Sequence, residues 1–337
     1  MNLRFFKYLL ALVLICGTTE MVYAQKRVAK KRTTRRTTNT RTRANVTNAQ
    51  AQVATPTPPP PPVNTDTIPL GQVKRSLRLD QAVDTSLSTN RTPLAYEHLR
   101  SDDAVYRHKI WREIDAREKM NQTFRYNSDE NNGNQRFISI LLQAIKDSAV
   151  TVFSPMDDRF TTPMTTEEVS AAVAGPLMAM DAYDSLGNVT ETKMIRNEVS
   201  LDSFYKFRIK EEVIFDKESS RLFTRILGIA PVGKTLTSNG LDLGPRVLFW
   251  VYYPDLRERF STYEVYNGKN MGARMTWEEL FESRFFSSRI IKSTIDNPFN
   301  MELKDYPSFR DRPILQLMEA EHIKNQIFDY EQGLWEY

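Results

Sequence analysis

Cysteine, histidine and glycine are scarce in this sequence, and each shortage argues against a class of function. The 337 residues include one cysteine, three histidines and 12 glycines. One cysteine cannot build a disulfide scaffold, and His98, His108 and His322 lack the i, i+4 spacing of a zinc site on a helix. No Gly-x-Ser-x-Gly elbow is present to hold a serine nucleophile. We therefore expect no catalytic, cofactor-binding or metal-binding residues.

Long hydrophobic runs are also missing, apart from a short one near the N-terminus. Two basic residues precede the apolar residues 8–16, and Val22 and Ala24 stand where a signal peptidase requires small side chains. No later stretch approaches the roughly 20 apolar residues that a membrane span needs. We expect residues 1–24 to be a signal peptide, and the mature chain to be exported, water-soluble and without cysteine.

Cys16 raises the alternative of a lipoprotein, because it lies at the end of the apolar run. Leu14 and Ile15, however, are too bulky for the small residues that a lipid-attachment motif carries before its cysteine. We therefore favour a cleaved signal peptide over a lipid anchor.

The segment after the signal peptide is basic and then rich in proline. Its prolines, Pro56 and Pro58 to Pro62, favour a polyproline II spacer, and its polar composition cannot bury enough apolar surface to offset the entropy of ordering. We predict a disordered tail and linker over residues 25–92. The basic residues of this tail are Lys26, Arg27, Lys30, Lys31, Arg32, Arg35, Arg36, Arg41 and Arg43, and residues 25–65 hold no acidic residue.

Charge is divided unevenly along the chain. The formal net charge is +4; with +9 in the tail and +1 in the signal peptide, residues 66–337 carry −6. Such a tail would bind nucleic acid through counterion release, but export argues against that encounter. Two interpretations of the tail remain: electrostatic attraction to an acidic partner or an anionic envelope surface, and a solvated tether.

Residues 93–337 are expected to form one folded body, and their spacing predicts several helices. Tyr106, Ile110 and Ile114 fall at i, i+4 and i+8, which predicts an amphipathic helix over residues 103–120. Residues 137–145 form a second apolar helix. Thr165 or Thr166 can cap a short helix, a capping box at residues 276–279 opens another to about Ser283, and a last helix runs from Asp311 and Pro313 to Gly333. In that helix we expect four residues to face inward: Ile314, Leu317, Met318 and Phe328.

Strands are predicted for the middle of the body. Residues 205–230 read as a hairpin with its turn at 216–220, and residues 184–188 suit the turn of another. Residues 247–253 form a third strand that ends at Pro254. The predicted fold class is α+β: a mixed, mainly antiparallel sheet packed with amphipathic helices and preceded by the disordered tail.

Residues 228–235 match the phosphate-binding loop pattern in full. Such a loop must lead directly into a helix whose N-terminus faces the phosphates. The residues that follow include Gly240, Gly244 and Pro245 where helical turns would be needed, so we interpret them as a loop between strands. Pro231 also removes one N–H donor. We therefore do not expect nucleotide binding.

Two pairs of adjacent acids are the remaining candidates for chemistry. Asp157-Asp158 and Glu211-Glu212 could serve a periplasmic hydrolase acting on a cell-wall or carbohydrate substrate. Adjacent carboxylates on a strand point to opposite faces, so one pocket rarely receives both. We favour solvated charges here and keep the hydrolase as the alternative function.

Aromatic residues are more informative than the acids. Residues 249–253, Phe-Trp-Val-Tyr-Tyr, place large rings on both faces of one strand, so that one face can pack in the core and the other can meet a partner. Tyr266 belongs to the same candidate surface. The candidate partner-contact residues are Trp250, Tyr252, Tyr253, Tyr263, Trp335 and Tyr337.

At these residues the chain resembles the GldN/PorN family, a periplasmic component of the type IX secretion and gliding-motility machinery of Bacteroidetes. The likeness covers most of the body, in ordered and correctly spaced segments, but not the basic tail. Val213 stands where the family often has Trp, and the region 296–306 lacks a fuller Asp-Arg stretch. The matching segments are residues 109–115, 118–119, 160–164, 225–231, 249–254, 284–288 and 328–337.

The resemblance implies a non-enzymatic structural subunit without a cofactor. Such a subunit assembles with the outer-membrane lipoprotein GldK/PorK into a periplasmic ring under the outer membrane, and contacts the inner-membrane-anchored GldM/PorM. A ring requires head-to-tail interfaces, and a protein without an anchor must take its membrane location from a partner. We therefore expect a peripheral periplasmic protein in a hetero-oligomeric ring, with no nucleic-acid partner and no direct membrane span.

Overall fold

The computed structural model describes residues 68, 70, 77, 78, 82 and 91–334, apart from 131, 176–177, 184–188, 196–199, 237–241 and 271–273. For residues 178–183, 189–195, 235–236 and 242–243 only the backbone is described. Contacts divide the chain into residues 1–60 and 61–337, and every structural statement below concerns the second unit. The predicted signal peptide and the nine basic tail residues lie outside the described residues.

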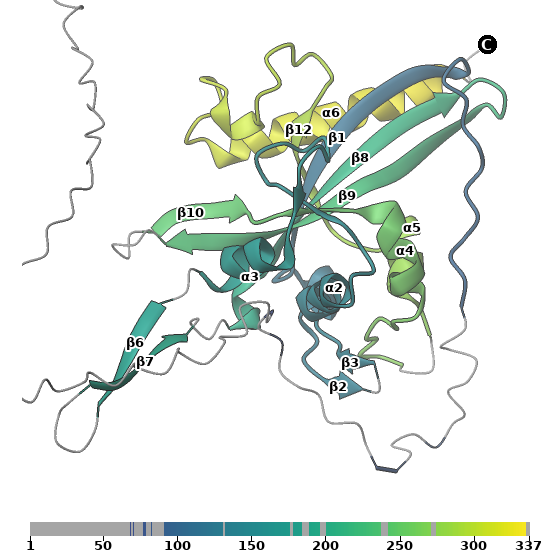
Figure 1. Ribbon diagram of the computed structural model, residues 1–337. Coiled ribbons are helices and arrows are strands. Elements are labelled where there is room, and N and C mark those ends of the chain that lie inside the picture. The colour runs from purple at the N-terminus through teal and green to yellow at the C-terminus, as the bar shows by residue number, and fades with distance from the viewer. Residues whose placement is uncertain are drawn as a thin grey trace, which may run out of the picture. The chain divides into compact units, whose positions relative to one another are not determined.

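The body is built on one antiparallel sheet, which runs across the centre of Figure 1. Among the described residues its strand order is β12-β1-β8-β9-β11-β4-β5, with β10 paired to the far end of β9. The fold class predicted from sequence, a mainly antiparallel α+β fold, is confirmed. The strands are β1 (Ala104–Asp115), β4 (Val152–Phe153), β5 (Pro163–Met164), β8 (Lys206–Asp216), β9 (Arg221–Leu236), β10 (Asp242–Val247), β11 (Trp250–Tyr252) and β12 (Arg289–Ser293).

The central hairpin of the sheet is the one predicted over residues 205–230. Strands β8 and β9 pair from Asp216 opposite Arg221 to Lys206 opposite Val232, with one shift of register between Lys210 and Glu211. The carboxylate of Asp216 accepts hydrogen bonds from the backbone N–H and the hydroxyl of Ser219, at 2.9 and 2.6 Å, which closes the turn. The pairing continues beyond the predicted end, because β9 runs on to Leu236.

The helix predicted over residues 103–120 is wrong, since this segment is strand β1. Tyr106, Ile110 and Ile114 are four residues apart. This spacing places side chains on one face of a strand, because it is even, and on one face of a helix, because it is close to one turn. The long-range partners decide between the two: β1 pairs with β8 along one edge and with β12 along the other. A 3₁₀ helix, η1 (Lys119–Arg125), follows where the predicted helix would have ended.

Helices cover the sheet at positions that the caps largely predicted. Helix α2 (Phe137–Lys146) confirms the predicted helix over residues 137–145. Complete capping boxes at Thr165 and Thr276 open α3 and α5, so both cap predictions are confirmed. The remaining helices and short 3₁₀ turns are α3 (Thr166–Ala174), α4 (Tyr253–Ser261), α5 (Trp277–Glu282), α6 (Pro313–Gly333), η2 (Leu201–Ser203) and η3 (Leu303–Asp305).

Two strand predictions need adjustment. The strand predicted over residues 247–253 is split between the end of β10 and the short β11, and Pro254 lies in the first turn of α4, where its missing N–H is tolerated. The predicted hairpin around residues 184–188 is present as β6 (Met178–Tyr183) paired with β7 (Val189–Ile195), although its turn lies outside the described residues. A further small hairpin joins β2 (Asp129–Glu130) and β3 (Gly133–Asn134).

The main core is an aromatic cluster in which α2 is buried on nearly every side. Phe137 of α2 lies 4.8 Å from Trp277, 4.9 Å from Phe207 and 5.1 Å from Phe124, measured between ring centroids. Each of the four rings is at most 2% exposed. Since such rings each bury a large apolar area, this cluster fixes η1, α2 and α5 against β8.

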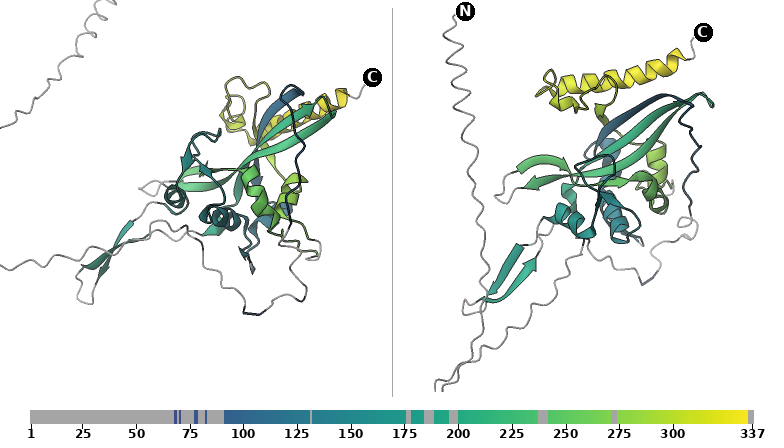
Figure 2. Two further views of the ribbon diagram at one scale, coloured as in Figure 1. Left: turned by 45° about the vertical axis from the view of Figure 1, so that its right-hand side comes forward. Right: turned by 45° about the horizontal axis from the view of Figure 1, so that its top comes forward.

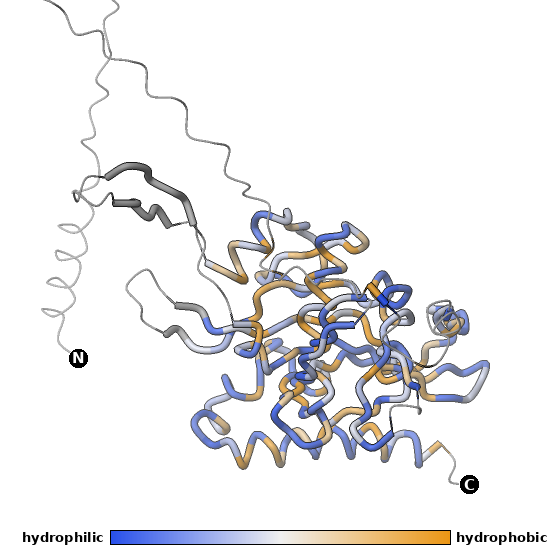
Figure 3. Tube along the Cα trace, turned by 90° about the horizontal axis from the view of Figure 1, so that it is seen from below, coloured by the Kyte–Doolittle hydropathy of each residue, from blue (hydrophilic) through white to orange (hydrophobic). Residues whose placement is uncertain are grey.

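Helix α6 packs beside β12, away from the main core, and Figure 2 shows it lying along the sheet. It buries only Ala320, Ile323 and Ile327, which contact Ile110 and other residues of a second apolar cluster. The predicted inward residues are wrong: Ile314, Leu317, Met318 and Phe328 are 72, 49, 63 and 56% exposed. Figure 3 shows apolar residues recurring along α6, and the stripe at 320, 323 and 327 is the one that meets the sheet.

The two capping boxes provide a stability prediction. Replacing Thr276 with Ala should lower the free energy of unfolding by about 1–2 kcal/mol, because the cap is 1% exposed and begins the helix that carries Trp277 and Phe281 into the core. The same change at the exposed Thr165 should cost about 0.5–1 kcal/mol. Urea unfolding of both variants measures the two losses, and a larger loss at Thr165 would contradict the prediction.

Candidate functional site

The face of the sheet formed by the middle of β1 and β8 carries charged side chains. Along β8, Lys206, Arg208 and Lys210 alternate with apolar residues and therefore point to the same face. Glu113 of β1 lies directly opposite Arg208, and Trp111 lies opposite Lys210. The two strands thus bring three cations, one carboxylate and one indole together.

Glu113 is the centre of this array. Its carboxylate is 2.8 Å from Nζ of Lys206, 2.5 Å from a guanidinium nitrogen of Arg289 and 3.9 Å from Nε of Arg208. Burial raises the pKa of Glu113, but the hydrogen bond from Lys206 and the charge of Arg289 outweigh it, so the pKa lies below the usual value. The carboxylate is therefore held ionised and tied to both neighbouring strands.

A second carboxylate joins the array from the loop after β12. Glu302 receives two hydrogen bonds from the Arg208 guanidinium, at 2.7 and 3.3 Å, and lies 3.0 Å from Nζ of Lys304. These cations lower the pKa of Glu302 despite its burial, which acts in the opposite direction. Arg208 thus connects the centre of the sheet to the segment that leads into α6.

Lys210 is the least exposed of the three β8 cations, at 3%. Its Nζ donates to the backbone oxygen of Asp158 at 2.5 Å and lies 3.5 Å from the Asp158 carboxylate, which is also 3.9 Å from Nζ of Lys292. Burial lowers the pKa of Lys210 more than the charge of Asp158 raises it. Both lysines stack on Trp111, with Nζ 4.2 Å from the ring centroid for Lys292 and 5.5 Å for Lys210.

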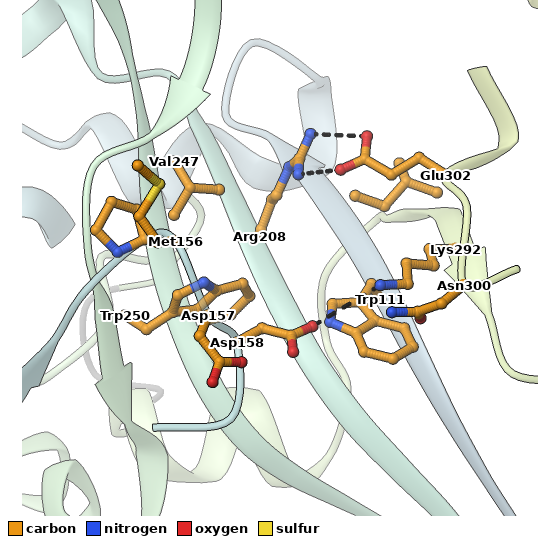
Figure 4. Close-up of a pocket in the computed structure, with 12 residues that line it drawn as sticks. Trp111, Met156, Asp157, Asp158, Arg208, Val247, Trp250, Lys292, Asn300 and Glu302 are labelled. Carbon is orange, nitrogen blue, oxygen red and sulfur yellow. Dashed lines mark hydrogen bonds and ion pairs between the residues drawn. The ribbon is translucent and has the colours of Figure 1, made fainter. Parts of the chain in front are cut away.

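A cavity of about 300 Å³ opens beside these residues. Figure 4 shows Asp157 and Asp158 between the indoles of Trp250 and Trp111, with the Arg208 guanidinium turned toward Glu302. We call this space the Trp111 cavity. It is lined mainly by Trp111, Asp157, Asp158, Arg208, Trp250, Lys292 and Glu302.

The loop that carries the two aspartates is held by Phe160. The Phe160 backbone adopts a φ of 59°, and its ring lies so close to Gly228 that a Cβ at position 228 would come within 2.6 Å of it. Asp157 accepts hydrogen bonds from the Arg159 N–H at 2.9 Å and from the Thr161 hydroxyl at 3.0 Å. The loop is therefore shaped by hydrogen bonds within itself and by the packing of Phe160 against β9.

The acid pairs are occupied by structural contacts. Glu211 is fully buried and accepts from Arg112 at 3.0 Å and from Arg284 at 2.9 Å, whereas Glu212 pairs with Arg107 at 2.5 Å. The expectation that these are solvated charges is wrong for this pair, because cross-strand cations allow both to be buried. The expectation that adjacent carboxylates face opposite ways is confirmed for Glu211 and Glu212, which have different partners, but it is wrong for Asp157 and Asp158, which lie in a loop and both line the Trp111 cavity.

The phosphate-loop pattern has a packing explanation. Residues 228–235 lie within β9, so the pattern itself forms a strand. The next described element is β10, while residues 237–241 of the predicted loop lie outside the described residues. Gly228 makes room for Phe160, and at Gly233 a Cβ would lie 2.9 Å from the Leu248 side chain. Both glycines are thus required by neighbouring side chains, and the backbone does not form a phosphate cradle.

The histidines and acids do not form a metal site within the part of the chain that the structure describes, where no group of three or more potential ligands comes together. His108 lies 3.2 Å from the Thr294 hydroxyl, and burial lowers its pKa. His322 lies 3.3 Å from the amide of Gln326 on the same helix.

Several candidate contact aromatics are buried, which corrects their proposed role. Trp250, Tyr253 and Tyr263 are 3, 0 and 5% exposed, because they pack in the core. The hydroxyl of Tyr253 donates to Glu282 and that of Tyr263 to the backbone of Asn132, at 3.1 and 3.0 Å. For the half-buried Tyr252 the contact role stays a prediction. Trp335 and Tyr337 lie outside the described residues.

The charged face of β8 was not predicted from the sequence. One signal was available, since residues 206–210 read Lys-Phe-Arg-Ile-Lys and alternate basic with apolar side chains. Glu113 and Glu302 lie more than 90 residues from the β8 cations that they contact, and Arg289 lies 176 residues from Glu113. No local sequence pattern links them.

The comparison with known families agrees with the resemblance read from the sequence. A family model described as "Gliding motility associated protein GldN" matches residues 99–336, more than two thirds of the chain. The matched range spans β1 to α6 and so includes every residue of the Trp111 cavity. No curated protein matches the chain.

The array around Glu113 predicts the acid limb of the stability profile. Because the folded pKa of Glu113 lies below its unfolded value, its contribution is present above that value and is lost as the pH falls through the folded pKa. Stability of the wild type should therefore fall between about pH 5 and pH 3. Replacing Glu113 with Gln should lower stability at pH 7 by about 3 kcal/mol, since it leaves Lys206 and Arg289 unpaired, and should flatten this fall.

Urea unfolding from pH 7 to pH 3 measures both effects. The exposed Asp329 is the matched control, and Asp329→Asn should retain the wild-type profile. An unchanged acid limb in Glu113→Gln would show that other groups control it.

Proposed function

The chain belongs to the GldN family of gliding-motility-associated proteins; on this premise we propose that it is a structural, non-enzymatic subunit of the gliding-motility and type IX secretion machinery. In the proposal it joins a GldK/PorK-like outer-membrane lipoprotein in a periplasmic ring and contacts GldM/PorM. Among the residues that the structure describes, no helix is both long and apolar enough to cross a bilayer. Its place at the outer membrane would then come from the lipoprotein.

The observation that carries a role in assembly is the outer surface of α6. Ile314, Leu317 and Met318 fall at i, i+3 and i+4, so they are neighbours on the helix, and they are 72, 49 and 63% exposed. Exposed apolar side chains that lie next to one another mark interaction sites more often than exposed apolar side chains that are scattered singly. We name these three residues the α6 contact face and assign the lipoprotein as its partner, in place of the buried Trp250, Tyr253 and Tyr263.

The alternative of a hydrolase has weaker support. Asp157 and Asp158 do line a cavity with two indoles, which is the arrangement that would favour it. Asp157, however, accepts two hydrogen bonds inside its own loop, and Asp158 is paired with two lysines. Both carboxylates are thus already engaged in contacts that they would have to give up to act on a substrate.

Co-purification tests the proposal. The mature chain, expressed with its lipoprotein partner, should co-purify with it, whereas Leu317→Asp with Met318→Asp should weaken the complex at least about tenfold, because two charges would enter an apolar interface. Asn325→Asp with Gln332→Asp adds the same charge to exposed positions of α6 and is the matched control. Equal co-purification of both double variants would remove the α6 contact face from the proposal.

Measuring protein secretion together with co-purification separates a structural role from an enzymatic one. Asp157→Asn should keep both the complex and protein secretion. A variant that keeps the complex and a native melting temperature but loses secretion would favour the hydrolase.

The basic tail should strengthen attachment electrostatically. Deleting residues 25–65 should weaken partner binding several-fold at low salt and little near physiological salt, where the screening length is about 8 Å. A tail of unchanged length with its nine lysines and arginines replaced by Gln is the matched control and should behave like the deletion. The same affinity at every ionic strength would leave the tail as a tether only.

A further inference from the structure

An isoleucine from the predicted linker is buried in the main core of the body. Ile68 is 1% exposed and belongs to the same apolar cluster as Phe137 and Trp277. Leu70 is partly buried against that cluster. The composition around these two residues predicted a linker without a fixed place, so this packing was not expected from the sequence.

The backbone at this point forms a tight turn. The N–H of Leu70 donates to the carbonyl of Ile68 at 2.7 Å, an i to i+2 hydrogen bond. This bond holds Leu70 close to Ile68, so both apolar side chains meet the same cluster.

Burial in this region is selective. Leu77 lies in the same predicted linker, only nine positions beyond Ile68, yet it is 99% exposed. General collapse of apolar residues onto the body would have covered both. The difference indicates an apolar socket in the body that fits Ile68 and Leu70 in particular.

The chain is attached to the body again at Arg91. The backbone oxygen of Arg91 accepts a hydrogen bond from the Ser261 hydroxyl at 2.9 Å, and its guanidinium lies 3.1 Å from Glu279. Residues 71–90 therefore connect two docked points. Because the cost of closing a loop grows only with the logarithm of its length, a connection of this size does not prevent docking of Ile68.

We propose that the body carries a binding socket for Ile68 and Leu70 of its own chain, and that these two residues are the anchor from which the basic tail extends. Hydrophobic burial of one isoleucine contributes a factor of about ten to a hundred in favour of the docked state, which the ordering of the segment and the closing of the loop reduce. The anchor shortens the tether of the tail: Arg43 is 25 residues from Ile68 but 48 from Arg91.

Thermal unfolding of the full mature chain tests the anchor. Ile68→Asp should lower the melting temperature by about 4 °C or more, because the socket is left empty or must take a charge. Leu77→Asp introduces the same charge into the same predicted linker at an exposed position and should melt with the wild type. Ile68→Ala, a milder change, should give an intermediate loss and serves if Ile68→Asp does not fold. Equal melting temperatures for the Ile68 and Leu77 variants would overturn the proposal.

A synthetic peptide of residues 61–75 tests the socket directly. It should bind the Ile68→Asp or Ile68→Ala chain saturably and recover part of the lost melting temperature, whereas the wild type, with its socket filled, should bind it at least about tenfold more weakly. The same peptide carrying Asp in place of Ile68 is the control and should not bind. Equal binding of both peptides, or of the intact peptide to both chains, would overturn the proposal. The lipoprotein is not needed, so the result is independent of the proposed function.

Discussion

Charge pairing across β1 and β8 is the interaction on which the sheet depends. The Glu113 and Glu211 side chains are only 7 and 0% exposed, and each is held by at least two cations from other segments. Removing the partners of a buried carboxylate costs several kcal/mol, so these pairs tolerate no rearrangement. They also specify the register, because a slip of one residue would turn Lys206 and Arg208 toward the face occupied by Phe207 and Ile209.

This pairing determines how the rest of the molecule can act. Arg208, which lies near both Glu113 and Glu302, also lines the Trp111 cavity, and Lys292 beside it lies near Asp158, so the charges nearest the cavity are already engaged with one another. Among the described residues, exposed apolar side chains lie along the outer surface of α6, and also at Met156, Phe285 and Phe299. A protein organised in this way is suited to binding other subunits, which agrees with its family and with the assembly role that we propose.

Sequence reasoning succeeded where a few adjacent residues decide the structure. The capping boxes at Thr165 and Thr276, the turn after Asp216 and the helix from residue 137 each depend on neighbours within one or two turns of chain. It failed at β1, whose apolar spacing suits a strand and a helix equally, and at α6, where two apolar stripes compete. In both cases the choice is made by surfaces far away in the sequence.

The amino-acid sequence by itself determined the antiparallel α+β class, the central hairpin and the rejection of a phosphate loop, because strand alternation, turn residues and helix breakers act locally. Only the tertiary structure decided that Glu211 is buried, that Gly228 is required by Phe160, and that Ile68 lies in the core. These facts depend on which residues meet across 65 or more positions of chain. The energy of burying a charge or a methyl group is set by those distant neighbours, and the sequence does not display them.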